Sequence, residues 1–172
     1  TQALLDIFTI RKECGKIDGL TIAMVGDLKY GRTAHSLAFL LANYKVKLIF
    51  VSPQQLKMPE YIKKHLNNKK ISFEETENLE TALQRAEVVY CTRVQKERFV
   101  DPAQYEHFKH YYVFNRKLIE KYNPKVILMH ALPRAGEVDP DVDTLPGAAY
   151  FRQAQNGVTV RMALLALLMG KA

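Results

Sequence analysis

Positively charged side chains follow three of the buried strands that the sequence predicts. They are Arg32 after the first strand, Arg93 and Lys96 after a later one, and Arg134 after the last. A guanidinium group makes planar, bidentate contacts with carboxylates and phosphates. Because ligands of open α/β sheets bind beyond the carboxyl ends of the strands, we expect a basic crevice there. Two arginines on different strand ends could hold the two carboxylates of a dicarboxylic acid, with Gln95 as a neutral donor.

Simpler interpretations exist for each of these side chains. Arg32, Arg93 or Lys96 taken singly is as consistent with a solvated loop charge as with a ligand contact. His130, at a strand end close to Pro133, is open in the same way between a structural and a functional role. His35, at the start of an otherwise apolar helix, is expected to make a structural hydrogen bond.

A nucleotide-binding turn is the weaker alternative. The turn after the first strand contains Gly26 and Gly31, but it has no G-x-G-x-x-G and no Walker lysine. The second strand ends at Ser52 and Pro53, where a dinucleotide site would require an acidic residue. The chemistry indicated by the sequence demands no metal and no cofactor.

The elements that must position these residues alternate between helices and short apolar strands. Such alternation predicts an α/β protein, a single Rossmann-like domain with a doubly wound parallel sheet and helices on both faces. We expect strands near 20–25, 46–51, 71–73, 88–92 and 125–129, and helices near 1–14, 32–44, 59–67, 78–86, 102–122 and 157–170. Gly15 and Asn78 are expected to cap two of the helices, and the run 162–169 is expected to be the core face of the last one.

Composition narrows the class of protein further. The 172 residues carry a net charge of +7 that is dispersed along the chain, unlike the concentrated basic stripe of a nucleic-acid binder. The apolar run 162–169 is too short to span a bilayer, which needs ~20 residues. Cys14 and Cys91 make neither a disulfide framework nor a metal site, so we expect a reducing, cytoplasmic location. We therefore expect no nucleic-acid and no membrane partner.

Several long motifs occur in a fixed order along the chain. They are residues 1–6, 26–33, 35–37, 92–98, 130–134, 150–153, 156–157 and 160–165. Together they resemble the catalytic chain of aspartate transcarbamoylases, in its carboxyl-terminal, aspartate-binding domain. The similarity covers essentially the whole chain, and the ordered set of motifs is far more specific than any one of them.

The resemblance implies a reaction and a role for each matching residue. The substrates would be carbamoyl phosphate and L-aspartate, and the products N-carbamoyl-L-aspartate and phosphate, on the route to pyrimidines. Arg32 would hold the α-carboxylate of aspartate, and Arg93, Gln95 and Lys96 its side-chain carboxylate. Arg32 and Arg93 are thus two of the expected catalytic residues.

The carbamoyl group would be bound by other parts of the chain. Gln2, the third expected catalytic residue, would contact it directly. The backbone at Leu132, together with Pro133, would accept a hydrogen bond from the carbamoyl nitrogen and shape the pocket. The resemblance also implies a cis peptide bond before Pro133.

The sequence departs from the family pattern at two places and lacks one motif. Ala131 stands where the family usually has proline, and Ala135 and Gly136 precede Glu137 where an acidic residue is common. The phosphate-binding Ser-Thr-Arg-Thr loop of the family does not occur. We therefore expect residues 1–172 to be one domain of a longer chain, inactive without its carbamoyl-phosphate domain. That chain would form a homotrimer, with regulatory subunits or fused pyrimidine-pathway enzymes as further partners.

Two alternatives remain at this stage. An ornithine-type transcarbamoylase domain shares the fold and the His-x-Leu-Pro motif, but its cationic substrate has the wrong charge for Arg93 and Lys96. A catalytically silent domain that scaffolds a multienzyme polypeptide is the other. The presence of the basic residues argues against a complete loss of aspartate recognition.

Overall fold

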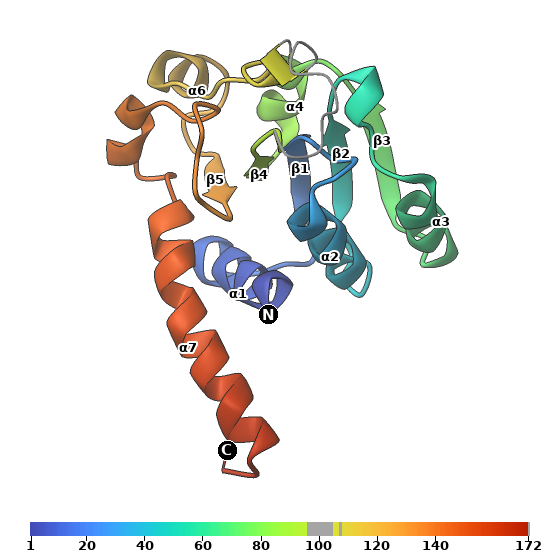
Figure 1. Ribbon diagram of the computed structural model, residues 1–172, viewed down its shortest axis with the longest axis vertical. Helices are drawn as coiled ribbons and strands as arrows, with labels where there is room; N and C mark the ends of the chain where they lie inside the picture. The colour runs from blue at the N-terminus through green and yellow to red at the C-terminus, as the bar shows by residue number, and fades with distance from the viewer. Residues whose placement is uncertain (96–104, 107, 172) are drawn as a thin grey trace.

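A five-stranded parallel sheet forms the centre of the molecule. The structure is a computed structural model that describes residues 1–95, 105–106 and 108–171. The strands lie in the order β3-β2-β1-β4-β5, as Figure 1 shows from right to left. Their bounds are β1 Thr21–Gly26, β2 Lys47–Val51, β3 Ser72–Thr76, β4 Val88–Thr92 and β5 Ile127–His130. The α/β, Rossmann-like fold expected from the sequence is confirmed.

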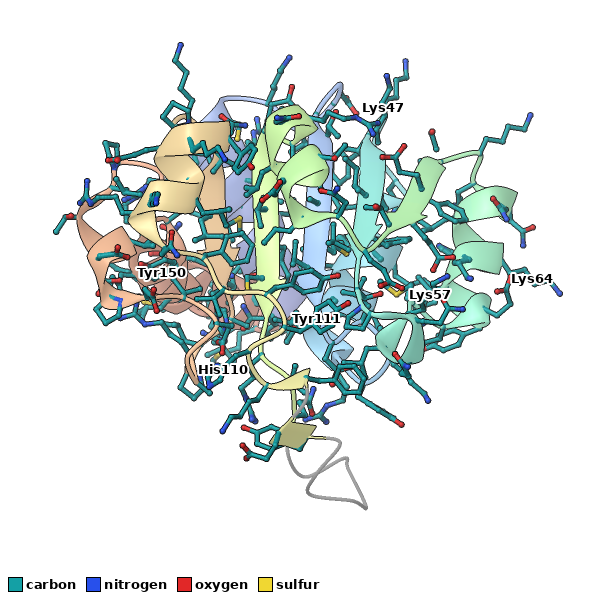
Figure 2. All side chains as sticks on the ribbon, turned by 90° about the horizontal axis from the view of Figure 1, so that it is seen from above. Lys47, Lys57, Lys64, His110, Tyr111 and Tyr150 are labelled. Atoms are coloured by element: carbon teal, nitrogen blue, oxygen red, sulfur yellow. The ribbon has the colours of Figure 1, made fainter. Side chains whose placement is uncertain are left out.

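Helices cover both faces of this sheet. On one face lie α1 (Gln2–Cys14), α2 (Arg32–Leu41) and α3 (Glu60–Asn68). On the other lie α4 (Leu79–Arg85) and α6 (Arg116–Tyr122), which are nearest the viewer in Figure 2. Two short 3-10 turns, η1 (Gln54–Leu56) and η3 (Pro140–Thr144), lie in the loops, and α7 (Tyr150–Leu168) closes the chain.

The strands are buried on both sides because successive side chains point to opposite faces. In β1, Ile22 and Met24 join the core beneath α1, α2 and α3, whereas Ala23 and Val25 join the core beneath α4 and α6. All four are fully buried. A continuous apolar run therefore encodes a central strand here, as expected for a parallel sheet.

The strand order brings three carboxyl ends to one place. The chain moves outward from β1 to β2 and β3, and then returns to pair β4 against the other side of β1. Gly26 is level with Thr92, and Cys91 is level with His130. The loops that follow β1, β4 and β5 consequently start side by side, at the switch point where α/β sheets bind ligands.

Local signals placed several boundaries correctly. Strand β4 spans the predicted 88–92, and Gly15 ends α1 in the left-handed conformation with φ 72°. The Asn78 side chain accepts a hydrogen bond from the backbone N–H of Thr81 and caps α4. In the predicted helical stretch 102–122 the structure shows α6 at 116–122, and residues 102–104 and 107 lie outside the described part.

The prediction for the last helix was wrong in two respects. Helix α7 begins at Tyr150 rather than near 157. The sequence predicts a helix boundary at Gly157, but this glycine lies inside α7, where the helix crosses α1. A Cβ atom at Gly157 would lie 3.2 Å from the Leu5 side chain, so glycine permits this close crossing. Second, the run 162–169 is not a core face, since Met162, Leu165 and Leu168 are 65%, 61% and 83% exposed.

Beyond the crossing with α1, helix α7 extends away from the rest of the molecule, with the C-terminus at its far end (Figure 1). Among the described residues, no helix has the length and apolarity needed to cross a membrane.

Gly26 is the tightest backbone position at the edge of the sheet that carries the three loops. Its φ is 117°, and a Cβ atom there would lie 2.2 Å from the carbonyl oxygen of Thr92. Gly15 also has a positive φ, but nothing lies within 4 Å of its Cβ position. We expect Gly15→Ala to cost about 1–2 kcal/mol of backbone strain alone. Gly26→Ala should cost at least about 1 kcal/mol more, because steric overlap adds to that strain.

Urea denaturation of the two variants measures this difference. Equal losses of unfolding free energy would show that the Gly26–Thr92 contact does not restrict the site edge.

Candidate functional site

A cavity of about 250 Å³ lies at the carboxyl ends of β1, β4 and β5. It is lined by the start of α2, the end of β4 with the residues after it, and the loop after β5. The lining residues are Gly31, Arg32, Thr33, Cys91, Thr92, Arg93, Gln95, His130, Ala131, Leu132 and Pro133. The three predicted strand-end segments therefore meet around one hollow.

The walls of this cavity favour anions. Arg32 and Arg93 contribute positive charge, and no Asp or Glu is among the described lining residues. Gly31 caps α2 without a side-chain hydrogen bond, and the first turn of α2 contains no acidic residue. The N–H groups of that first turn add partial positive charge at the same place. Across residues 1–95, 105–106 and 108–171, the Arg32 side chain makes no ion pair or hydrogen bond.

A buried carboxylate fixes the loop between β1 and α2. Asp27 is fully buried, and its Oδ1 accepts a hydrogen bond from the Tyr30 N–H at 2.9 Å. Its Oδ2 lies 3.5 Å from the backbone nitrogen of Gln95, and the Gln95 amide donates to the Tyr30 carbonyl at 3.1 Å. Burial raises the pKa of Asp27, and the N–H groups of Tyr30 and Gln95 partly offset this shift. The carboxylate thus ties the loop that carries Arg32 to the segment that carries Arg93.

The loop after β5 is held in an unusual backbone conformation. Leu132 has φ 56°, in the left-handed region, which costs a residue other than glycine about 1–3 kcal/mol. The peptide bond from Leu132 to Pro133 is cis, as the resemblance implies. The Leu132 N–H donates to Nδ1 of His130 at 2.8 Å, and Nε2 of His130 lies 2.7 Å from Oε1 of Glu137.

Glu137 is the second buried carboxylate of this edge, with its side chain 6% exposed. Burial alone would raise its pKa, but the contact with His130 and the N–H of Ala135 outweigh that effect and lower it. The Ala135 N–H lies 3.0 and 3.2 Å from the two Glu137 oxygens. Glu137 is therefore held as an anion within the loop.

A third buried carboxylate, Asp6, connects α1 to the end of β5. Its Oδ1 accepts from the Gln2 amide at 2.8 Å and from the Gln153 amide at 2.7 Å. Gln153 in turn accepts the backbone N–H of His130 at 2.8 Å. Burial raises the pKa of Asp6 to about 6, and the hydrogen bonds from Gln153 and Gln2 reduce the shift.

Most of the residues predicted from the sequence meet at the cavity. Arg32, Arg93, Gln95, Leu132 and Pro133 all line it. Gln2 is not among the lining residues and reaches the site through Asp6 and Gln153. Lys96 lies outside the described residues.

The expectation that Arg134 belongs to the basic crevice was wrong. Its guanidinium group pairs with Asp143, donates to the Tyr150 hydroxyl at 3.3 Å, and stacks on the Tyr150 and Phe151 rings. It does not line the cavity. Residues that follow neighbouring strands share an edge of the sheet, but this does not fix the direction of their side chains. The Arg134 side chain points toward Asp143, nine positions further along the chain.

His35 has the structural role expected for it. Its Nε2 lies 2.7 Å from the Leu28 carbonyl oxygen, and the Tyr61 hydroxyl lies 3.1 Å from its Nδ1. The histidine thereby joins the loop after β1 to α2 and α3.

Sequence reasoning missed the acids behind the site. Asp6, Asp27 and Glu137 contact backbone and amide groups rather than the cavity itself, so no charge pattern revealed them. Gly26-Asp27 directly after a strand was a usable signal, because a carboxylate there can accept the N–H groups of the following turn. Within the described ranges, no three His, Cys, Asp or Glu side chains cluster as metal ligands.

The chain belongs to the family described as aspartate/ornithine carbamoyltransferase, Asp/Orn binding domain, which it matches over residues 18–168. Several of its relatives are named as aspartate carbamoyltransferases. It is 52% identical to the aspartate carbamoyltransferase catalytic subunit of Leptospira biflexa, over 99% of this chain and 54% of that subunit. It is 54% identical to the multifunctional protein pyr1-3 of Dictyostelium discoideum, over 99% of this chain and 8% of that protein.

Solved structures agree with this placement. The catalytic subunit of M. jannaschii aspartate transcarbamoylase superposes with a TM-score of 0.92 at 48% identity, covering 99% of this chain and 57% of that one. The aspartate transcarbamoylase from Trypanosoma cruzi in complex with carbamoyl phosphate and aspartate gives 0.87 at 39% identity, over 95% and 55%. The chain spans about half the length of these single-enzyme relatives.

Asp6 predicts a specific dependence of stability on pH. The pKa of Asp6 rises from the usual 3.8 of an aspartate to about 6 in the folded protein, so the folded protein holds this proton up to about pH 6. The folded protein is therefore most stable with respect to Asp6 below about pH 4, where this carboxyl is protonated in both the folded and the unfolded state. As the pH rises through 6, the free energy of unfolding should fall by about 3 kcal/mol. Asp6→Asn should lack this loss, because an amide oxygen can still accept both donors that use Oδ1.

Urea denaturation of wild type and Asp6→Asn between pH 4 and 7.5 provides the measurement. The variant should gain stability relative to wild type as the pH rises. Asp18→Asn, at an exposed position, controls for the loss of one negative charge. A wild-type-to-Asn difference that stays constant over this range would contradict the assignment.

Proposed function

We propose that this chain is the aspartate-binding half of an aspartate carbamoyltransferase, which transfers the carbamoyl group of carbamoyl phosphate to L-aspartate. The observation that carries the proposal is the charge of the cavity. Arg32 and Arg93 come from different strand ends, the uncapped start of α2 adds to them, and the described walls contain no carboxylate. Membership of the Asp/Orn-binding family supplies the reaction class.

In this proposal each carboxylate of aspartate meets its own arginine. Arg32 holds the α-carboxylate, and Arg93 with Gln95 holds the side-chain carboxylate. Lys96, outside the described residues, would add a further positive charge there. One Gln95 amide hydrogen already bonds the Tyr30 carbonyl, so the second is the one available to substrate. Two guanidinium groups on the walls of one cavity would favour a dicarboxylate over a monocarboxylate.

The reaction needs orientation more than acid–base chemistry from this half. The aspartate amine attacks the carbamoyl carbon, a C–N bond forms, the C–O bond to phosphate breaks, and the amine gives up a proton. Holding the amine against the carbonyl carbon removes much of the entropic barrier. Gln2 and the Leu132–Pro133 backbone are proposed to position the carbamoyl group.

Charge also separates aspartate from ornithine as the substrate. Ornithine would bring a cationic side chain toward Arg93, whereas aspartate brings a carboxylate. The Leptospira biflexa subunit and the M. jannaschii structure are both named for aspartate. Competition by succinate but not by norvaline, measured on the longer protein that contains this domain, is the result expected here. Competition by norvaline alone would instead support the ornithine-type reading.

The partner domain and assembly belong to the same proposal. Because the chain spans about half of its single-enzyme relatives, we propose that the carbamoyl-phosphate-binding half lies elsewhere in a longer chain. That chain would act as a homotrimer in the cytoplasm, where the free thiols of Cys14 and Cys91 suit a reducing environment. Fusion to other pyrimidine enzymes has a precedent in the multifunctional relatives.

The part of α7 that extends beyond the sheet carries exposed apolar side chains, as expected if another domain packs against it. Val158, Met162, Leu165 and Leu168 are each more than 60% exposed, on a helix that extends beyond the sheet. Exposed apolar surface of this extent is typical of an interface. We propose that the other half of the longer chain covers it.

Arg93→Ala should weaken aspartate binding severely. Removing one partner of a desolvated ion pair costs on the order of 2–5 kcal/mol, so the aspartate KM of the longer protein should rise steeply. Arg85→Ala, which breaks an exposed pair with Glu74 on the outer part of the sheet, is the matched control. Steady-state kinetics decide the matter, and an unchanged KM in Arg93→Ala would reject the proposed role.

The 172-residue chain by itself should form little or no carbamoyl-aspartate. The phosphate-binding groups are proposed to lie in the other half, so the leaving group has nothing to hold it. A colorimetric assay for carbamoyl-aspartate with the purified chain tests this, with the longer protein as the positive control. If the isolated chain formed carbamoyl-aspartate at a rate comparable to that of the longer protein, the phosphate-binding groups would not lie in the other half.

The effect of the double substitution Leu165→Glu and Leu168→Glu on stability should differ between the 172-residue chain and the longer protein. In the 172-residue chain both side chains are exposed, so unfolding free energy should change by less than about 0.5 kcal/mol. In the longer protein the same change should be clearly destabilising, because two charges would be buried. Chemical denaturation of both proteins gives the comparison, and equally small effects in both would show that α7 stays uncovered.

A further inference from the structure

His130 lines the cavity, yet its Nδ1 is hydrogen-bonded within the loop and its Nε2 is buried in close contact with Glu137. It is 3% exposed at the end of β5. Nδ1 accepts the Leu132 N–H at 2.8 Å, so Nδ1 carries no proton. The ring proton therefore lies on Nε2, which is 2.7 Å from Oε1 of Glu137. Because Nε2 is buried against Glu137 and Nδ1 is hydrogen-bonded to Leu132, neither ring nitrogen is open to a ligand in the cavity.

We propose that His130 and Glu137 form a buried brace that positions the backbone of Leu132 and Pro133 at the cavity wall. Both are positioning residues, and neither takes a proton from the substrate. The inference rests on the proposed function, because it gives the Leu132–Pro133 backbone its task of orienting the carbamoyl group. It adds two residues to the machinery and excludes His130 as the acid or base.

The geometry of the loop supports a brace. His130 bonds the backbone two residues ahead, at Leu132, and Glu137 bonds the backbone two residues behind, at Ala135. The two side chains meet each other across the loop. The left-handed conformation of Leu132 is unfavourable in isolation, so something must hold it, and the Nδ1 contact acts directly on that residue.

The two ends of the brace are anchored separately. The backbone N–H of His130 donates to Gln153, which α7 carries and Asp6 orients. The backbone carbonyl of Glu137 accepts the Phe114 N–H at 2.9 Å. One end is thus fixed to α7 and the other to the segment that contains Phe114. A change at His130 or Glu137 should therefore alter the loop between them without moving β5.

The tautomer provides the first test, on the 172-residue chain without any ligand. Nitrogen-15 NMR of histidine-labelled protein at pH 7.5 should show His130 with its proton on Nε2 and an unprotonated Nδ1. A proton on Nδ1 would overturn the proposal. This measurement is independent of aspartate binding, so it judges the brace even if the dicarboxylate assays fail.

Amide exchange provides the second test on the same chain. In His130→Ala the Leu132 amide loses its acceptor, and its hydrogen exchange should accelerate about tenfold or more. In His130→Asn an amide oxygen can replace Nδ1, so exchange should remain close to that of wild type. His65→Ala, at a histidine on α3 remote from the cavity, is the control. Equal exchange in wild type and His130→Ala would contradict the brace.

Kinetics of the longer protein separate positioning from proton transfer. If His130 only positions the loop, His130→Asn should keep most of kcat, while His130→Ala raises the aspartate KM and lowers kcat. Glu137→Gln should resemble wild type more than Glu137→Ala, because the Gln oxygen can still accept from Nε2. Loss of kcat in His130→Asn as complete as in His130→Ala, with the Leu132 amide still protected, would show a chemical role instead.

Discussion

The loops at the carboxyl edge of the sheet are held by carboxylates that lie behind the site rather than in it. Asp27 holds the turn before α2, Glu137 holds the loop after β5, and Asp6 connects α1 with α7. Burying an ionised carboxylate is costly unless several donors satisfy it. Each of these acids therefore requires a specific set of N–H groups, and this requirement fixes the backbone around the cavity.

The same arrangement separates the two signs of charge. Acids face inward to backbone and amide donors, while Arg32 and Arg93 face the cavity. An anion that enters meets Arg32 and Arg93 on walls that contain no Asp or Glu among the described residues. Had Asp27 or Glu137 turned toward the hollow, either would have competed with a dicarboxylate for the guanidinium groups. Anion binding in the cavity thus depends on the burial of Asp27 and Glu137 behind its walls as much as on the presence of Arg32 and Arg93 in them.

Sequence reasoning recovered the sheet because its signals are local. The run Val88–Thr92 is apolar at every position but its last, so a strand buried on both faces was the natural interpretation, and its carboxyl end fixed the place of Arg93. Arg32 and Gln95 followed from the same rule, whereas Leu132 and Pro133 followed from the resemblance to aspartate transcarbamoylases. Arg134 did not, because its position depends on Asp143 and Tyr150, whose approach is set by tertiary structure. The exposure of Met162 was equally hidden, since an apolar helix face looks the same whether its partner is within the chain or outside it.

The crossing of α1 and α7 joins the first and last helices of the chain. The Asn156 amide donates to the Thr9 hydroxyl there, and Gly157 leaves room for the Leu5 side chain. The two helices therefore support one another beside the sheet. One fold of this size can therefore be carried intact as half of a single enzyme or as a small fraction of a very long polypeptide, and relatives of both kinds exist.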